Sequence, residues 1–498
     1  MDIQVKSLKL DKIKTDVIVI PVFQDSKPME ENFQKIDAML GKVLSKALVE
    51  DKSFAEEGQF NSFLSGKRID VKEVILAGMG KDKKITEDKL RKFGGKLVNY
   101  LKSKNLSKVV VLSFGLGLKK VQVDRATYCL TEGLVLGGYS FDKYKSKCDS
   151  GKDKKEIKSI TLLPQNDFEE KQMKKPINEA VTICNVTNIV RDLVNEPANV
   201  ATPKYLADFA KKLFKKTKVK CKVLDKKAIK KLGMNLLLGV SKGSSEDPRL
   251  ILLEYKGKCE KLGLVGKGVT FDAGGLNLKP SAYMDDMKED MGGAAAVLGV
   301  FKAVADLKLS ANLVGVIPCT ENLCGSSAQK PGDVILTASG KTVEIANTDA
   351  EGRLILADAL WYTATKLKPK KMIDIATLTG ASVVTLGKIV APIVGTDKEL
   401  IDGLVTASNT SYERLWELPF YEEYLEDVKG KVADIKNLGL PKGEAGVIAG
   451  GAFLNEFVND IPWAHIDIGG AVNSNGNGYI AKGHSGFGVR VLVEYLKG

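Results

Sequence analysis

Short runs of β-branched and aliphatic residues alternate with longer helix-like segments along most of the chain. In the first part, residues 17–22, 74–77 and 109–112 form such runs, and residues 87–102 have the pattern of a helix. Strands that alternate with helical segments are typical of parallel or mixed sheets, because the crossover between parallel strands is usually a helix. The pattern therefore predicts an α/β fold with mixed sheets flanked by helices.

The alternation occurs in two series, which indicates two domains. A chain of 498 residues is long enough for two or three domains with cores of their own. Between the series, Pro176 is well placed to open a helix over residues 176–194. We expect a smaller N-terminal α/β domain over residues 1–165 and a larger C-terminal α/β domain over residues 166–498, with this helix as a linker. In the second series, strands are expected at residues 249–254, 262–266, 312–318, 371–376 and 389–394, and helices at residues 205–216, 290–307 and 354–367.

The chain has only two histidines, His465 and His484, which limits the metal sites it can build. A three-histidine zinc site and an H-E-x-x-H helix are both excluded, so any metal must be held mainly by carboxylates. The seven cysteines include no C-x-x-C pair and lie mostly in apolar runs, as expected for free thiols in a reducing compartment.

Nothing in the sequence predicts secretion or a membrane span. Charges recur through residues 1–23, and the most apolar stretch, residues 292–307, is broken by Lys302 and is too short to cross a bilayer. We therefore expect a cytoplasmic protein with no membrane partner. The net charge of +13 permits nucleic-acid binding without predicting it, and the lysine-rich residues 143–159 are expected to form a solvated loop, with a polyanion-binding patch as the alternative.

Two neighbouring segments carry candidate functional residues. An apolar strand ends in a glycine-rich loop that holds Lys267, Asp272 and Lys279, and ligands of α/β sheets bind at such strand ends. Asp286 and Asp290 follow at i, i+4 spacing, which predicts that they lie on one helical face directly before a small, apolar helix. Considered separately, the glycine-rich loop could have a structural role only, and the acidic residues could simply interact favourably with a helix dipole.

A third segment contains Asp349 and Glu351, followed by Arg353 and a helix expected to start near Leu354. On extended backbone, Asp349 and Glu351 would project to the same side, as two ligands of one cluster require. The three segments together could hold two divalent ions ~3.5 to 4 Å apart, an arrangement that activates water for hydrolysis. The carboxylates of this predicted cluster are Asp272, Asp290, Asp349 and Glu351.

The motifs in these segments resemble those of the leucyl aminopeptidase family, also called cytosol aminopeptidases. The resemblance is carried by NTDAEGRL from Asn347 and GKGVTFDAGG from Gly266. RDLVNEPAN, ATLTGA, VADIKNLG, WAHIDIGG and GFGVR follow the family pattern in order and spacing, so the resemblance covers residues 185–498 strongly. GYSFDKYK from Gly138 extends it weakly into the first domain, which the resemblance makes an assembly or regulatory domain beside a C-terminal catalytic one.

The resemblance implies a role for each matching residue. One metal ion would be held by Lys267, Asp272, Asp290 and Glu351, and the other by Asp272, Asp349 and Glu351 with the Asp349 carbonyl. Lys279 would stabilise an oxyanion, and Arg353 would hold a bicarbonate that serves as general base. The substrate-binding residues implied by the family pattern are Lys279, Met287, Asn347, Thr377, Leu378 and Gly380, with Gly469 beside the pocket for the first side chain.

The implied function is a metal-dependent aminopeptidase that releases leucine and other apolar residues from peptides with a free N-terminus. Mn²⁺ or Zn²⁺ is expected, with Co²⁺ or Mg²⁺ as alternatives, and the resemblance implies a homohexamer. Gly469, often alanine in the family, suggests a slightly roomier pocket. The alternatives are a DNA-binding or other binding protein on the same scaffold and, third, a phosphoryl-transfer enzyme, for which a phosphate-cradling loop is lacking.

Overall fold

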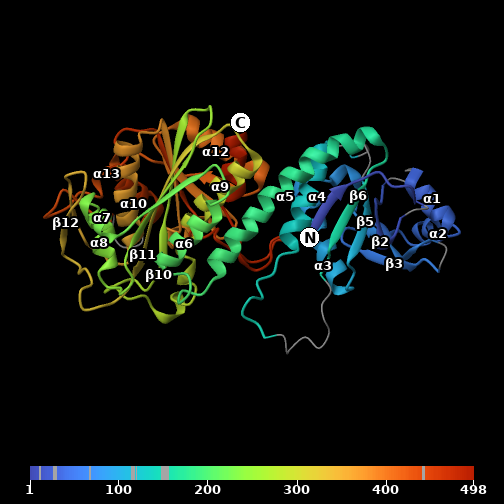
Figure 1. The fold of residues 1–498 in the computed structure, drawn as a ribbon, viewed down its shortest axis with the longest axis horizontal. Helices are drawn as coiled ribbons and strands as arrows, with labels where there is room; N and C mark the ends of the chain where they lie inside the picture. Colours follow the sequence, from blue (N-terminus) through green and yellow to red (C-terminus); the bar gives the residue numbers. More distant parts are fainter. Residues whose placement is uncertain are drawn as a thin grey trace. The chain divides into compact units, whose positions relative to one another are not determined.

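The computed structural model describes residues 1–498 except 11–12, 26–30, 67–68, 114–117, 119, 147–155 and 440–443. The described chain forms two compact units. Unit 1 comprises Met1–Asn185 with Gly476–Ala481, and unit 2 comprises Val186–Asn475 with Lys482–Gly498. Each unit contains a large sheet with covering helices (Figure 1), so the α/β fold class expected from the sequence is confirmed.

Unit 1 is built on a six-stranded sheet in the order β1-β6-β5-β2-β4-β3, in which only the edge pair β3–β4 is antiparallel. Alternate residues of β2, such as Ile18 and Ile20, are buried in a core with Phe33 and Ile36 of α1, as the period of two along a strand requires. The elements are β1 (Asp2–Val5), β2 (Thr15–Val22), α1 (Glu31–Met39), α2 (Val43–Glu50), η2 (Lys52–Ala55), β3 (Phe60–Leu64), β4 (Val71–Gly78), η3 (Asp82–Lys84), α3 (Glu87–Ser103), β5 (Lys108–Leu112), α4 (Val123–Gly137) and β6 (Ser159–Leu163).

A short segment from far along the chain belongs to unit 1. Gly476–Ala481 follows nearly all of unit 2 in the sequence but clusters with the first 185 residues. A Cβ placed on Gly95 of α3 would lie 2.2 Å from the Gly478 carbonyl oxygen, so glycine permits this close approach. The chain therefore passes between the units three times.

The helix expected to open at Pro176 begins earlier. Helix α5 spans Asp167–Asn195, with Pro176 inside it. Asn166 accepts a hydrogen bond from the Glu169 amide, and the Glu169 side chain accepts one from the Gln165 amide, so side-chain capping fixes the start. The boundary expected at residue 165 precedes α5, whereas the compact units divide within it, after Asn185.

Unit 2 is built on a nine-stranded mixed sheet. Its order is β16-β15-β18-β14-β9-β11-β8-β7, with β10 also paired to β11. The strands of this sheet are β7 (Lys220–Leu224), β8 (Arg249–Tyr255), β9 (Lys261–Gly266), β10 (Gly268–Asp272), β11 (Asn312–Asn322), β14 (Lys371–Ala376), β15 (Val390–Gly395), β16 (Arg414–Glu417) and β18 (Trp463–Asp467). Smaller sheets are formed by β12 (Val334–Leu336), β13 (Thr342–Glu344) and β17 (Ile435–Lys436), and by β19 (Asn473–Ser474) and β20 (Gly483–His484).

Helices cover both faces of this sheet. Figure 1 shows α8 and α10 on one side and α6, α9 and α12 on the other. The α8 and α10 side shares one buried core with β9, β11 and β14. The helices are α6 (Pro203–Phe214), α7 (Lys226–Lys231), α8 (Asn235–Ser241), η6 (Ser281–Tyr283), η7 (Met287–Glu289), α9 (Gly292–Leu307), α10 (Glu351–Tyr362), the π-helical turn η8 (Thr363–Leu367), α11 (Ala381–Leu386), α12 (Lys398–Ser411), α13 (Glu423–Glu426), α14 (Gly446–Asn455) and α15 (Val489–Lys497).

The central strands of unit 2 run in the same direction. Strands β18, β14, β9, β11 and β10 form consecutive parallel pairs, so their carboxyl ends meet at one edge of the sheet. Lys267 follows β9, Asp272 ends β10 and Thr377 follows β14. The topology therefore brings the predicted site residues to the edge where α/β proteins bind ligands.

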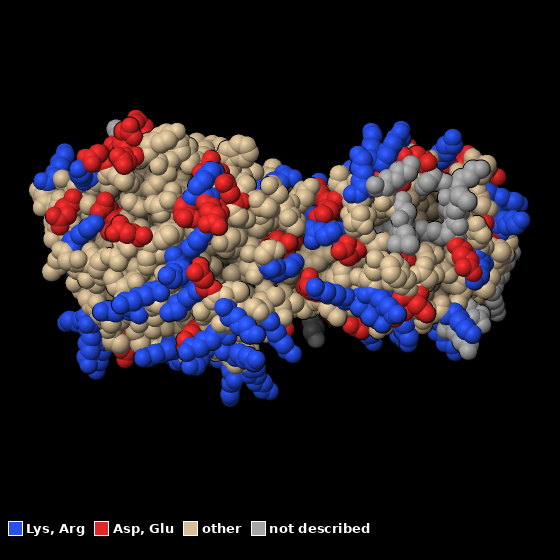
Figure 2. All heavy atoms as spheres, turned by 90° about the horizontal axis from the view of Figure 1, so that it is seen from above, with Lys and Arg blue, Asp and Glu red and all other residues tan. Residues whose placement is uncertain are grey.

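Basic and acidic side chains are mixed on the surface of the chain. Figure 2 shows lysine and arginine side chains over much of the face it presents, interspersed with aspartate and glutamate. The lysine-rich stretch of residues 143–159 lies partly outside the described residues. Across the parts of the chain with an assigned structure, no helix is long and apolar enough to span a bilayer.

Candidate metal centre and substrate pocket

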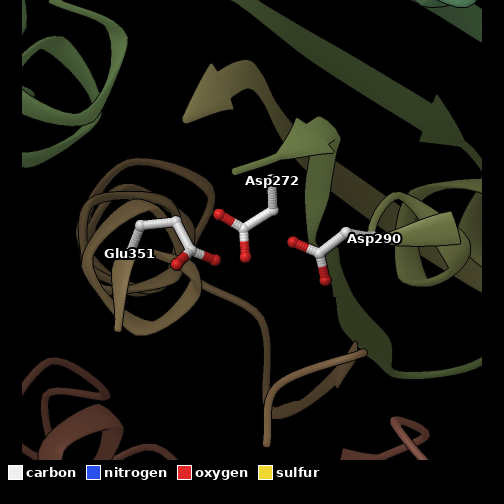
Figure 3. A group of neighbouring side chains, drawn as sticks. All are labelled: Asp272, Asp290 and Glu351. Atoms are coloured by element: carbon white, nitrogen blue, oxygen red, sulfur yellow. The ribbon is translucent and has the colours of Figure 1, made fainter. Parts of the chain in front are cut away.

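Three buried carboxylates meet at the carboxyl edge of the unit 2 sheet. Asp272 ends β10, Asp290 follows η7 and Glu351 is the first residue of α10. One oxygen of each lies within 4.8 Å of the others, and Figure 3 shows the three carboxylates turned toward one another, with that of Asp272 in the middle. A group of buried oxygen donors at this spacing could hold a metal ion.

Two lysines occupy the same cluster. Lys267 Nζ lies 2.6 Å from Asp290 Oδ1 and 3.0 Å from Glu351 Oε1, and it donates to the Thr377 carbonyl at 2.8 Å. Lys279 Nζ lies 2.8 Å from Asp272 Oδ2 and 2.5 Å from Asp349 Oδ1. The fourth predicted carboxylate, Asp349, is therefore joined to Asp272 through Lys279.

Glycines make room for this packing. A Cβ on Gly352, in the first turn of α10, would lie 2.5 Å from Lys267 Cε and 2.8 Å from its Nζ. A Cβ on Gly274, which has a φ of +91°, would lie 2.8 Å from Asp349 Oδ1. The glycines at these two positions therefore let the lysine and the carboxylate come close to the backbone.

Asn322 was not singled out from the sequence, yet it joins two of the carboxylates. It ends β11 and is buried, and its Nδ2 donates to Asp272 Oδ1 at 2.8 Å and lies 3.4 Å from Glu351 Oε2. The strand was expected to end at Pro318, where the apolar run stops. The sequence signal that could have identified Asn322 is its place at the carboxyl end of a parallel strand, where polar residues lie beside ligand sites.

The local backbone differs from two expectations. Asp286 and Asp290 flank the 3₁₀ helix η7 and do not share an α-helical face: Asp286 is exposed and Asp290 is buried. Glu351 begins α10, three residues before the expected start near Leu354, so the condition of extended backbone at both Asp349 and Glu351 is not met. The carboxylates meet because separate turns of the chain place them at the same edge of the sheet.

Burial dominates the protonation of the cluster. It raises the pKa of Asp290 well above its usual value despite Lys267, and it raises the pKa of Glu351 to about 6. Burial alone would lower the pKa values of Lys267 and Lys279, but the surrounding carboxylates raise both above the ordinary value for lysine. Ionising these buried carboxylates therefore costs free energy, and nearby cations reduce that cost.

The donor set fits divalent ions. Asp290 Oδ2 is buried and has no hydrogen-bond partner within the described residues, although such atoms are normally satisfied. Four carboxylates face two ammonium groups, which leaves a deficit of two positive charges when all six are ionised. Oxygen donors of this kind suit Mn²⁺ and Mg²⁺, and a neutral lysine nitrogen would also suit Zn²⁺.

Arg353 is buried beside the cluster on α10. Its Nη1 donates to the Asn437 carbonyl at 3.0 Å, and its Nε finds no partner among the residues with described positions. Burial lowers the pKa of Arg353 to about 10, with Glu351 and Asp467 opposing this shift. A buried guanidinium with a free donor is suited to binding a small anion.

The cluster opens into a cavity of about 680 Å³. Every residue that the sequence analysis assigned to a metal, catalytic or substrate role lines it. These residues are Lys267, Asp272, Lys279, Met287, Asp290, Asn347, Asp349, Glu351, Arg353, Thr377, Leu378 and Gly380. The structure thus brings all the predicted site residues together, while His465 lies in the core with Asp374.

Gly469 also lines the cavity, but it does not enlarge the pocket. A Cβ at this position would lie 2.6 Å from the Thr379 carbonyl oxygen and 2.9 Å from Ser382 Oγ. The space beside Gly469 is therefore occupied by the neighbouring loop, and the expectation of a roomier pocket at this residue is wrong.

Family models match both parts of the chain. Residues 188–493 match the cytosol aminopeptidase family, catalytic domain, and residues 19–148 match the cytosol aminopeptidase family, N-terminal domain. Among solved structures, the fold is similar to "Bottromycin maturation enzyme BotP in complex with Mn", with a TM-score of 0.83 and 30% identity over 97% of this chain and 99% of that one.

Full-length relatives agree with this assignment. A probable cytosol aminopeptidase of Geobacter sp. (strain M21) is 42% identical, over 97% of each chain. One of Alkaliphilus oremlandii (strain OhILAs) is 39% identical, over 100% of this chain and 99% of the relative. Together with the site geometry, these matches show that the chain belongs to the cytosol aminopeptidase family, whose members are metal-dependent peptidases.

Proposed function

We propose that the chain holds two divalent ions at the carboxylate cluster and releases leucine and other apolar residues from the free N-terminus of peptides. The observation that carries this proposal is the meeting of four carboxylates and two lysines at one wall of a cavity. Met287, Thr377 and Gly380 line the same cavity and offer uncharged surface for the first side chain of a substrate.

The proposed ligands divide into two sets that share Asp272 and Glu351. Lys267 and Asp290 complete the first set, and Asp349, with its side chain and carbonyl, completes the second. Bound ions would polarise the scissile carbonyl and lower the pKa of a water molecule. Mn²⁺ is favoured by the oxygen donors and by the description of the BotP structure, and Zn²⁺, Co²⁺ and Mg²⁺ are the alternatives.

The two lysines would take different roles. Lys267 can act as a ligand only after it loses its proton, because an ammonium group has no lone pair. Lys279 lies nearer the opening, and the carboxylates around it raise its pKa, so it keeps its charge. A charged donor at this position would stabilise the oxyanion that forms when the carbonyl is attacked.

The remaining proposed roles belong to other residues that line the cavity. Arg353 is the proposed anchor of a bicarbonate ion that serves as general base. The Leu378 carbonyl would accept a hydrogen bond from the free α-amine of the substrate, and Asn347 would contact its backbone. An apolar pocket discriminates by only about 1 to 3 kcal/mol per methylene, so broad specificity is expected.

The cellular setting is also part of the proposal. The naming of the relatives as cytosol aminopeptidases supports a cytoplasmic location, and family membership supports a homohexamer. Peptides with a free N-terminus would be the substrates.

The test is cleavage of leucine p-nitroanilide by chelator-stripped protein before and after addition of Mn²⁺, Zn²⁺, Co²⁺ or Mg²⁺. N-acetyl-leucine p-nitroanilide is the control substrate, because it lacks the free amine. D290N should abolish restoration by metal, whereas D286N, which removes an exposed carboxylate four residues earlier, should not.

Restored cleavage of the free-amine substrate alone would support the proposal. No cleavage with any ion, by protein shown to be folded, would refute it and favour the binding-protein alternative. That alternative predicts a mobility shift with duplex DNA that weakens steeply with salt. Hydrolysis of a phosphomonoester under the same conditions would instead favour phosphoryl transfer.

A further inference from the structure

Glu289 is a carboxylate of the cavity that the proposed metal site does not use. It ends η7, directly before Asp290, and lines the same cavity. Because a 3₁₀ helix has three residues per turn, Met287 and Asp290 share a face, and Glu289 lies about 120° to the side. Its side chain is 11% exposed, so the carboxylate is set into the cavity wall.

Among the described residues, the neighbours of Glu289 donate a hydrogen bond to only one of its two oxygens. Its Oε2 accepts a hydrogen bond from Asn473 and lies 3.6 Å from His484 Nδ1. Burial lowers the pKa of His484 to about 4, so this imidazole is neutral at physiological pH. In the described part of the chain no donor reaches the other oxygen, Oε1.

Three other charged groups lie near this wall. Asp286, at the cavity mouth, is a second carboxylate, and Lys388 is a single lysine on the rim. The charge of Lys288 also acts on Glu289, but its Nζ donates its hydrogen bond to the Asn195 carbonyl at 3.0 Å. Two carboxylates and two lysines therefore lie near this wall, and within the described residues neither lysine donates a hydrogen bond to Oε1 of Glu289.

We propose that Glu289 makes the pocket for the first side chain accept basic residues. A lysine or arginine at the substrate N-terminus would pack its methylene stem against Met287 and donate from its charged end to Oε1 of Glu289. This inference rests on the proposed aminopeptidase function and extends it to a second class of substrate. Leucine-like residues would use the same pocket without reaching the carboxylate.

A purely supporting role for Glu289 makes a different prediction. If its carboxylate only holds Asn473 in place, its loss would affect all substrates alike. Direct recognition affects only side chains that carry a donor. Lysine and norleucine separate the two cases, because they share an unbranched four-carbon stem and differ in the terminal amine.

The experiment measures kcat/KM for p-nitroanilides of lysine, norleucine and leucine with Mn²⁺ at pH 8.5. At this pH the lysine side chain of the substrate is protonated. We expect wild-type protein to prefer lysine to norleucine, and E289Q to lower the lysine-to-norleucine ratio about tenfold, the value of a charge-assisted hydrogen bond. D286N, the matched control at the exposed mouth, should change the ratio less than about twofold.

The outcomes separate this inference from the function on which it rests. A ratio that is unchanged in E289Q, in protein that cleaves the leucine substrate, overturns the inference alone. No cleavage of any free-amine substrate with any ion overturns the proposed function and the inference with it. If E289Q does not fold, E289D keeps the charge but withdraws it by one methylene, and it should lower the ratio by a smaller factor; an unchanged ratio again overturns the inference.

Discussion

Replacement of Gly352 by alanine tests whether the position of Lys267 beside Asp290 and Glu351 depends on the space left by this glycine. The new methyl group would lie 2.5 Å from Lys267 Cε and 2.8 Å from Nζ, closer than carbon and nitrogen atoms approach without a bond. Lys267 is fully buried, so its side chain cannot move aside into solvent. We expect G352A to push the ammonium group away from Asp290 and Glu351.

Two opposing terms set the size of this effect. Alanine is favoured over glycine in a helix by about 1 kcal/mol. Separating a buried ion pair costs about 3 to 5 kcal/mol, because the charges left behind are desolvated. The metal-free protein should therefore lose about 2 to 4 kcal/mol of unfolding free energy, measured by urea denaturation.

A double-mutant cycle identifies the cause. In a K267A background the methyl group has room, so G352A should then be neutral or stabilise by up to about 1 kcal/mol. Calorimetry should also show weaker Mn²⁺ binding for G352A alone than for wild type. The reasoning is refuted if G352A has the same effect on stability in both backgrounds and leaves Mn²⁺ affinity unchanged.

Three further perturbations have defined outcomes. Burial raises the pKa of Asp358 to about 7, although the Leu237 amide opposes this shift, so the protonated side chain contributes fully to stability below pH 4 and this contribution is lost as pH rises to 7. Urea titrations should show the free energy of unfolding decline by up to about 4 kcal/mol over this range in wild type but not in D358N. Parallel curves for the two proteins would contradict this. If Lys267 is the metal ligand that we propose, it must release a proton to bind, so the apparent Mn²⁺ affinity should rise with pH up to about tenfold per pH unit, and a K267M variant should show a flatter dependence by calorimetry. G95A should destabilise unit 1 by about 1 to 3 kcal/mol, because its methyl group would meet the Gly478 carbonyl at 2.2 Å; a midpoint of unfolding equal to that of wild type would argue against this packing.

The sequence predicted the strands well where apolar runs are short and bounded. Residues 371–376 were expected as a strand, and β14 spans Lys371–Ala376. Segments governed by tertiary contacts were predicted less well. The end of β11 at Asn322 is polar and was missed, because its burial depends on Asp272 and Glu351 from other parts of the chain.

The site residues could be named from motifs, but their geometry could not. The sequence suggested an α-helical face for Asp286 and Asp290, whereas a 3₁₀ turn buries one and exposes the other. The role of Glu289 depends on Asn473 and His484, which lie more than 180 residues away in the sequence. No local pattern reports a neighbour at that separation.

The segment Gly476–Ala481 has a consequence for the order in which the protein matures on the ribosome. This segment packs in unit 1, yet the 290 residues of Val186–Asn475 are translated between Asn185 and its first residue. At 5 to 20 residues per second, that interval is roughly 15 to 60 s. The first 185 residues would wait through this time with the surface around Gly95 uncovered. A gene fragment that ends at residue 185 should therefore yield a poorly soluble product, and fusing residues 476–481 to its end should improve recovery.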